Sequence, residues 1–168
     1  MKLKKGQTVV HPRHGTATVE DFEEREIDGE VIEYVVLRRE EDRLTVRVPV
    51  EQYDEVGLRT IIEESDVDDV LSVLTEDPKG SQASWRKRHA KHEKRLKSGD
   101  PEELAVLLRE LTARAETKGI PPSDKLLRDK ARERLIGELA ASLDRDESEV
   151  EQMVDEALDE ALGTVEDE

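Results

Sequence analysis

Cysteine, aromatic side chains and long apolar runs are all scarce in this 168-residue sequence. It contains no cysteine, one Trp, one Phe and two Tyr. The lack of cysteine excludes disulfides, thiolate catalysis and cysteine-based zinc sites. No apolar run approaches the roughly 20 residues that span a bilayer, and the first residues lack the apolar segment of a signal peptide. The sequence therefore predicts a cytoplasmic protein with no membrane partner.

Positive charge is concentrated in one segment of an acidic chain. Residues 84–97, with the sequence SWRKRHAKHEKRLK, hold seven Lys or Arg against one Glu, together with the only Trp. This segment carries +6 and the rest carries −22, which gives the net charge of −16. Such segregation favours a polyanionic partner. Because the acidic remainder repels a duplex beyond about one Debye length, roughly 8–10 Å, any DNA contact is expected to be local.

Trp85 gives this basic segment a second property. An indole can stack on an unpaired base or wedge into a base step, which favours distorted or opened nucleic acid. The alternative is that Trp85 is a core anchor and the charges form a solvated helix face. As a helix, the segment has only a thin apolar stripe of Trp85 and Leu96. A helix with so little to bury is expected to present its surface.

The first 58 or so residues are predicted to form β-strands. β-branched or alternating runs occupy residues 8–10, 16–19, 31–37 and 44–50. Asp28-Gly29 is the dipeptide that a two-residue type I′ hairpin turn prefers. In the last run, the apolar side chains of Leu44, Val46, Val48 and Val50 share one face. Arg47 is therefore expected on the displayed face of a compact, antiparallel, barrel-like domain.

After residue 59 the apolar period changes from two to 3.6, which indicates helices. The expected helix starts are Ser65, the Trp85 segment, Asp100-Pro101, Ser123 and Asp146. Asp100 with Pro101 is the strongest of these signals, because it combines a capping side chain with a first-turn proline. The second half is thus predicted to be a bundle of about five helices that ends in an acidic tail, residues 166–168.

No motif in the sequence indicates an enzyme or a cofactor site. There is no Gly-rich phosphate loop, no nucleophile elbow and no metal-ligand cluster. His89 and His92 lie one helical turn apart, but Glu93 is expected to be the only nearby acid, and Lys91 and Lys94 repel a cation. We therefore expect no metal there.

Short motifs occur in a fixed order along nearly the whole chain. In the first half they are Gly6-x-x-Val9-Val10-x-Pro12-x-His14-Gly15 with Val19, residues 44–49 (LTVRVP) and residues 56–59 (VGLR). In the second half they are Trp85-x-x-Arg88, Ser98-Gly99-Asp100, Lys125, Lys130-Ala131-Arg132 and Glu138-Leu139-Ala140. In this order and spacing the chain resembles the CarD and CdnL bacterial transcription regulators, whose first domain is shared with the transcription-repair coupling factor.

The resemblance implies a cofactor-free, monomeric α+β protein of two domains that is associated with the nucleoid through RNA polymerase. Residues 1–60 would form a Tudor-like barrel that docks, through Arg25 and Arg47, on the β subunit of polymerase carrying the housekeeping sigma factor. Residues 61–168 would form a helical domain at the upstream fork of the transcription bubble, where Trp85 wedges into the minor groove and stabilises the open complex. The basic residues expected to contact DNA are Arg86, Lys87, Arg88, Lys91 and Lys125.

The residues by themselves leave another class of function open. In an acidic adaptor, Trp85 would anchor a partner helix and the basic segment would grip that partner's acidic surface. Arg25 and Arg47, considered singly, suggest only surface solubility. Their roles and that of Lys125 rest on the resemblance. The chain also departs from many relatives at His89, where they have an aromatic residue, and at Glu93, near which they have an apolar one.

Overall fold

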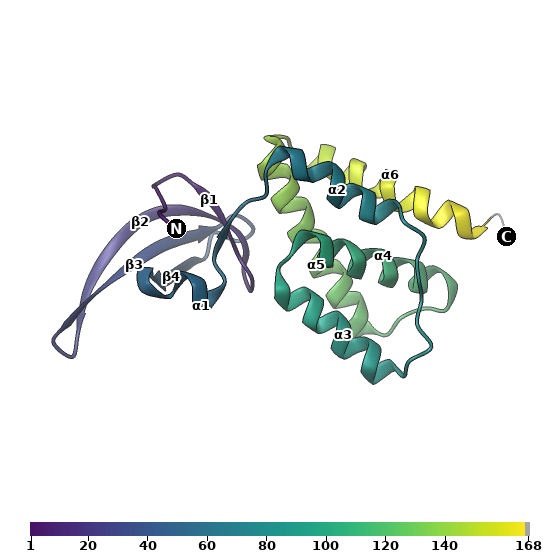
Figure 1. Cartoon of the computed structure of the whole chain (residues 1–168), viewed down its shortest axis with the longest axis horizontal. Helices are drawn as coiled ribbons and strands as arrows, with labels where there is room; N and C mark the ends of the chain where they lie inside the picture. Colours follow the sequence, from purple (N-terminus) through teal and green to yellow (C-terminus); the bar gives the residue numbers. More distant parts are fainter. Residues whose placement is uncertain (167–168) are drawn as a thin grey trace. The chain divides into compact units, whose positions relative to one another are not determined.

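The computed structural model describes residues 1–166 and divides into two units, Met1–Ile61 and Ile62–Glu168 (Figure 1). Each unit has its own cluster of buried apolar side chains. Unit 1 is built mainly of strands and unit 2 of helices, so the chain is a two-domain α+β protein. Within the described residues, no helix is long and apolar enough to cross a membrane.

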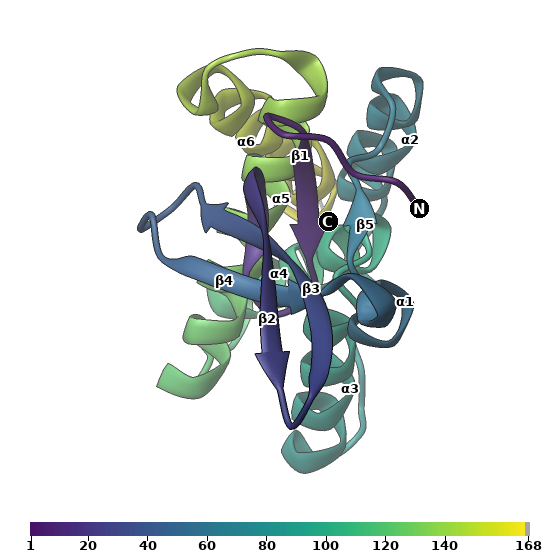
Figure 2. The same cartoon turned by 90° about the vertical axis from the view of Figure 1, so that its left-hand side faces the viewer.

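Unit 1 contains one five-stranded antiparallel sheet. Its strands are β1 (Thr8–His11), β2 (Gly15–Ile27), β3 (Glu30–Arg39), β4 (Thr45–Pro49) and β5 (Arg59–Thr60). Their order is β4-β3-β2-β1-β5, so β5 lies beside β1 (Figure 2). Asp28 and Gly29 have φ values of 53° and 83°, and Ile27 pairs with Glu30. The predicted two-residue hairpin turn is confirmed.

A β-bulge in β2 determines which of its side chains face away from the core. The register with β3 shifts between Val19 and Asp21. Before the shift Val19 faces the core, and after it Phe22 packs there, because the extra residue reverses the alternation. Glu23 and Arg25 are thereby placed on the outer face of the hairpin, on the same side as Asp21.

Two expectations for unit 1 are wrong. Val50 does not extend a strand but begins the 3-10 helix η1 (Val50–Gln52), which leads into α1 (Tyr53–Val56). Leu44 precedes β4 and is 56% exposed rather than facing inward. Burial of Tyr53 in the core of unit 1 accounts for the helical turn, because tertiary packing overrides the local strand pattern. Arg47 is exposed, as predicted.

The described residues of unit 2 form a bundle of five helices, as predicted. They are α2 (Glu64–Thr75), α3 (Trp85–Ser98), α4 (Pro101–Thr117), α5 (Pro122–Leu143) and α6 (Glu147–Glu166). α4 packs against α2, α3 and α5, and α6 packs against α2 and α5. Four leucines of α4, Leu104, Leu107, Leu108 and Leu111, are buried in the shared core. Residues 167 and 168 of the predicted acidic tail lie outside the described residues.

The helix starts show which local signals hold. Asp100 accepts a hydrogen bond from the Glu102 amide at 2.8 Å, with Pro101 as the first helical residue, which confirms that prediction. The predicted starts at Ser65 and Ser123 are wrong, because α2 begins at Glu64 and α5 at Pro122, both without a capping side chain. The chain entering α2 is held from α5 instead. The Ile62 amide donates to the Glu138 carboxylate at 2.9 Å, and the Ser142 hydroxyl donates to the Ile62 carbonyl at 2.8 Å.

Candidate nucleic-acid interface

The basic segment forms helix α3, with Trp85 in its first turn. Ser84 caps the helix by accepting a hydrogen bond from the Lys87 amide, and Gly99, with φ of 66°, ends it in the left-handed conformation. His92 and Leu96 are 7% and 8% exposed, so one side of α3 packs into unit 2. Trp85 remains 42% exposed, so it is not a core anchor. The helix presents most of its surface, as the sequence indicates.

The indole of Trp85 is held by two neighbours. Its Nε1–H donates a hydrogen bond to Asp124 Oδ2 at 3.3 Å, across from α3 to the first turn of α5. The imidazole of His89 stacks on it, with ring centroids 4.8 Å apart and planes 23° from parallel. His89 thus provides a ring that packs on the indole from the next turn of α3. The indole of Trp85, the candidate wedge, is thus held by Asp124 and His89 while part of its surface stays exposed to solvent.

Two carboxylates flank the His89 ring. Its Nδ1 lies 2.6 Å from Asp124 Oδ1, and its Nε2 lies 2.7 Å from Glu93 Oε1. Each ring nitrogen of His89 therefore has a carboxylate oxygen within hydrogen-bond distance. Asp124 is only 2% exposed and serves both rings at once. The expectation that Glu93 is the only acid near His89 is therefore wrong.

Asp124 is the functional candidate that the sequence did not reveal. It lies 39 residues from Trp85, and an acid in a first helical turn is common enough to carry no signal of its own. The adjacent Lys125, singled out only through the resemblance, is exposed beside it. Within the described residues, no group of three His, Cys, Asp or Glu side chains could hold a metal ion.

The other predicted DNA contacts lie around these residues. Arg86, Lys87 and Lys91 are exposed on α3. Arg88 is half-buried and donates a hydrogen bond to the Ala83 carbonyl, so it also fixes the approach to the helix. Because Asp124 and Lys125 are adjacent on α5, the contact between Trp85 and Asp124 brings the α5 start to the Trp85 end of α3.

In unit 1, the two predicted polymerase contacts share one acid. Arg47 Nε lies 3.0 Å from Glu23 Oε2, and an Arg25 guanidinium nitrogen lies 3.4 Å from the same oxygen. The hydrogen bond from Arg47 is the largest cause that lowers the pKa of Glu23 below its usual value. Glu23 therefore stays ionised and holds two exposed arginines, from β2 and β4, on one face of the sheet.

Comparison with known proteins covers both units. The model of the CarD C-terminal domain matches residues 69–155, more than half of the chain, and the model of the CarD-like/TRCF RID domain matches residues 3–62. A protein of Bacillus subtilis (strain 168) named "Putative transcription factor YdeB" is 26% identical over 134 residues, which cover 80% of this chain and 88% of the relative.

One solved structure is also similar in sequence to the first unit. It is the solution NMR structure of the 72-residue N-terminal domain of Myxococcus xanthus CarD. The identity is 34%, the match covers 35% of this chain and 79% of that chain, and the TM-score is 0.31.

Proposed function

Because this chain belongs to the CarD and CdnL family of transcription-associated regulators, we propose that it docks on the RNA polymerase β subunit and stabilises the promoter open complex. The match of residues 3–62 to the CarD-like/TRCF RID domain suggests an interaction with RNA polymerase. The observation that carries the proposal is Trp85, which is 42% exposed at the start of a basic helix and held by Asp124. The proposed target is polymerase with the housekeeping sigma factor.

In this mechanism Trp85 enters a base step at the upstream fork of the transcription bubble. Opening such a step costs a few kcal/mol, and stacking on an aromatic ring returns about 1–3 kcal/mol per base. The cost of opening the step and the gain from stacking nearly cancel. The conformational entropy that the indole loses on binding therefore affects whether insertion is favourable. The hydrogen bond to Asp124 and the stack on His89 restrict the indole beforehand, which reduces this entropic cost.

The basic residues around Trp85 are proposed to hold the DNA backbone. In this proposal none of the five residues contacts a base edge: Arg86, Lys87, Arg88, Lys91 and Lys125. Contacts between cations and phosphates position a protein on DNA, release counterions and make binding dependent on salt. Sequence preference would therefore come from how easily the DNA at the fork is distorted.

Docking by unit 1 compensates for weak binding to free DNA. A chain of net charge −16 should bind free duplex feebly. We propose that unit 1, as a Tudor-like domain, tethers the chain to polymerase through Arg25 and Arg47. Such a tether raises the local concentration of unit 2 at the fork to the order of millimolar. A preference of about 1.4 kcal/mol for open over closed DNA then shifts the equilibrium tenfold, with no catalysis.

The lifetime of a promoter open complex tests the proposal. The complex is formed with housekeeping holoenzyme from a related bacterium, challenged with competitor DNA, and followed with wild type, Trp85→Ala, Trp85→Phe and no added protein. Wild type is expected to prolong the lifetime about tenfold, which corresponds to about 1.4 kcal/mol. Trp85→Phe, which keeps a stacking ring, should retain part of this effect, and Trp85→Ala should retain none. A Trp85→Ala protein that acts like wild type would overturn the wedge.

A further inference from the structure

Unit 2 contains a basic groove, which lies between residues 76–83, α3 and α4. Its volume is about 770 Å³, within the range of roughly 300–1,000 Å³ typical of ligand sites. Eight Lys or Arg residues line it against two Glu residues, on a chain whose net charge is −16. Trp85 is not among the lining residues, so this basic groove is separate from the wedge candidate.

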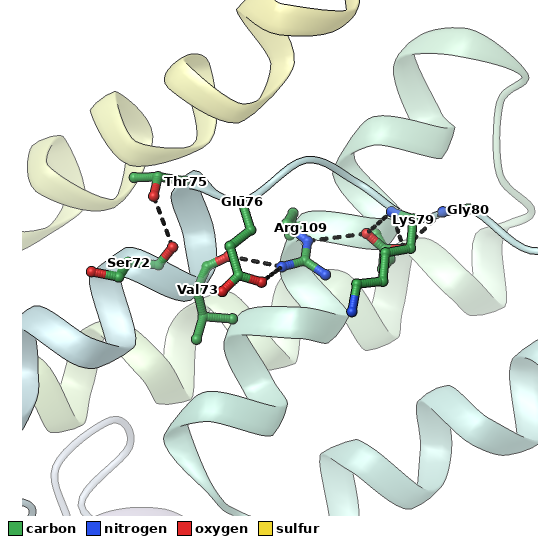
Figure 3. Close-up of polar contacts among 8 residues, drawn as sticks. Ser72, Val73, Thr75, Glu76, Lys79, Gly80 and Arg109 are labelled. Atoms are coloured by element: carbon green, nitrogen blue, oxygen red, sulfur yellow. Dashed lines mark hydrogen bonds and ion pairs between the residues drawn. The ribbon is translucent and has the colours of Figure 1, made fainter.

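Both acids of the basic groove are already engaged by the protein. Arg109 is 1% exposed, donates to the Val73 carbonyl at 2.8 Å and forms ion pairs with Glu76 at 3.2 Å and Glu110 at 3.1 Å. Glu110 also accepts hydrogen bonds from the amides of Lys79 and Gly80 at 2.8 and 2.9 Å. These contacts fix the segment after α2 against Arg109 (Figure 3). The groove wall is thus built by the fold before any ligand arrives.

Most cations of the groove have no such partner. Six of the lining cations form no ion pair with a carboxylate in the described part of the chain: Lys79, Lys87, Arg88, Lys91, Arg114 and Lys118. They come from all three walls, and all are exposed except Arg88 and Arg114, which are half-buried. Like charges gathered without counter-charge repel one another, and a concave arrangement focuses their field. A bound anion would relieve this repulsion.

His92 contributes no charge to the groove. It lines the groove but is 7% exposed, and burial is the largest cause that lowers its pKa, so the ring is neutral at pH 7. Its Nδ1 atom is buried without a hydrogen-bond partner among the described residues. The positive field of the groove therefore comes from lysine and arginine side chains, which stay charged across the physiological range.

We propose that the basic groove is a binding site for a run of two or more phosphates. Lys and Arg donors suit phosphate oxygens, and the described lining contains no Phe, Tyr or Trp on which a base could stack. The groove therefore recognises phosphates rather than bases. A nucleic-acid backbone and a free oligophosphate both carry this chemistry. If the ligand is a nucleic-acid backbone, the inference rests on the proposed function, because Lys87 and Lys91 are also proposed DNA contacts. If the ligand is a free oligophosphate, the inference does not rest on it.

Two probes distinguish these sources in a titration of the full chain without polymerase. One is inorganic tripolyphosphate, and the other is a short DNA strand made entirely of abasic sites, which offers phosphates but no bases. The groove variant is the double substitution Arg114→Gln with Lys118→Gln. The matched control is the double substitution Lys130→Gln with Arg145→Gln, which removes two exposed cations that neither line the groove nor belong to the proposed DNA contacts. Circular dichroism checks that every variant is folded.

Wild type is expected to bind at least one probe, and the groove variant to bind it at least tenfold more weakly. The slope of log affinity against log salt should fall by about two for the abasic strand, one for each cation removed. The control should stay within twofold of wild type for both probes. Binding of tripolyphosphate alone assigns the groove to a free oligophosphate, and binding of the abasic strand alone assigns it to a backbone. No binding, or equal binding by the groove variant, overturns the proposal. The open-complex effect of Trp85 is measured independently, so each proposal can fail without the other.

Discussion

Charged clusters occur in both units, but their exposure is opposite. In unit 1 the side chains of Arg25, Glu23 and Arg47 are 54%, 37% and 39% exposed. In unit 2 Arg109 and Asp124 are 1% and 2% exposed and bind groups from neighbouring elements. Exposed ion pairs add little to stability, whereas breaking a buried pair is costly. The charges of unit 1 are therefore available to a partner, and the buried ones of unit 2 hold its own structure.

Replacing Arg109 should give the largest effect on stability. Arg109→Met leaves Glu110 and the Val73 carbonyl without their buried partner, which is expected to lower the free energy of unfolding by about 3–5 kcal/mol. Arg132→Met is the matched control. Arg132 pairs with Asp155 and Glu151, but its side chain is 27% exposed, so its loss should cost less than about 1 kcal/mol. Urea unfolding followed by circular dichroism measures both. Equal losses would remove the distinction between buried and exposed pairs.

Reversing the charge of Arg47 should affect binding and spare stability. Arg47→Glu places a second acid beside Glu23 and removes the proposed polymerase contact. We expect association with polymerase to weaken at least tenfold, or by about 1.4 kcal/mol, in a co-purification or interferometry assay.

Arg43→Glu provides the control for Arg47→Glu. It changes the charge equally at an exposed position of the same unit, outside the pair with Glu23. Association of this control should match wild type. Equal weakening in both variants would show that general charge, and not the Glu23 cluster, governs docking.

Asp124 offers a smaller and more local test. Asp124→Ala removes the acceptor of the Trp85 indole and a partner of His89, at a cost of roughly 1 kcal/mol in stability. The freed indole should show altered fluorescence, and the open-complex lifetime should fall severalfold. Asp124→Asn keeps one carbonyl oxygen for the indole and should lie between Ala and wild type. Unchanged fluorescence and lifetime in Asp124→Ala would show that Asp124 does not position Trp85.

The smallest expected effect is a pH dependence caused by His92. Burial lowers its pKa in the folded protein below the usual 6.5, so the unfolded chain binds the proton more readily. Stability from this residue is fully present above pH 6.5 and is lost as the pH falls toward the folded pKa, with a slope of at most about 1.4 kcal/mol per pH unit. His92→Leu should flatten this part of the unfolding profile. An unchanged profile would contradict the assignment.

The elements that the sequence predicts well are those specified by neighbouring residues. Asp28-Gly29 needs only its own positive φ values, and Asp100 needs only the amide of Glu102, so both were predictable. The start of α2 is different. It is held by contacts from Glu138 and Ser142, which lie 76 and 80 residues away, and no local pattern encodes them.

The candidate site divides in the same way. The exposed Trp85 and its basic neighbours follow from composition and helical spacing, because a helix with few apolar residues must face outward. The contact between Asp124 and Trp85, and the burial of Arg109, depend on how α3, α4 and α5 pack. A charged residue in an acidic, highly charged chain gives no sign that it is buried. The roles of Arg25, Arg47 and Lys125 were expected only through the resemblance, and they remain predictions.

The division of labour between the units is tested most directly by titrating variants into the open-complex assay. If unit 1 acts only as a tether, a large excess of Arg47→Glu should restore the full lifetime, because concentration replaces the lost docking. No excess of Trp85→Ala should do so, because the wedge itself is missing. The account predicts this asymmetry. Rescue of Trp85→Ala by excess protein, or failure to rescue Arg47→Glu at any concentration, would contradict it.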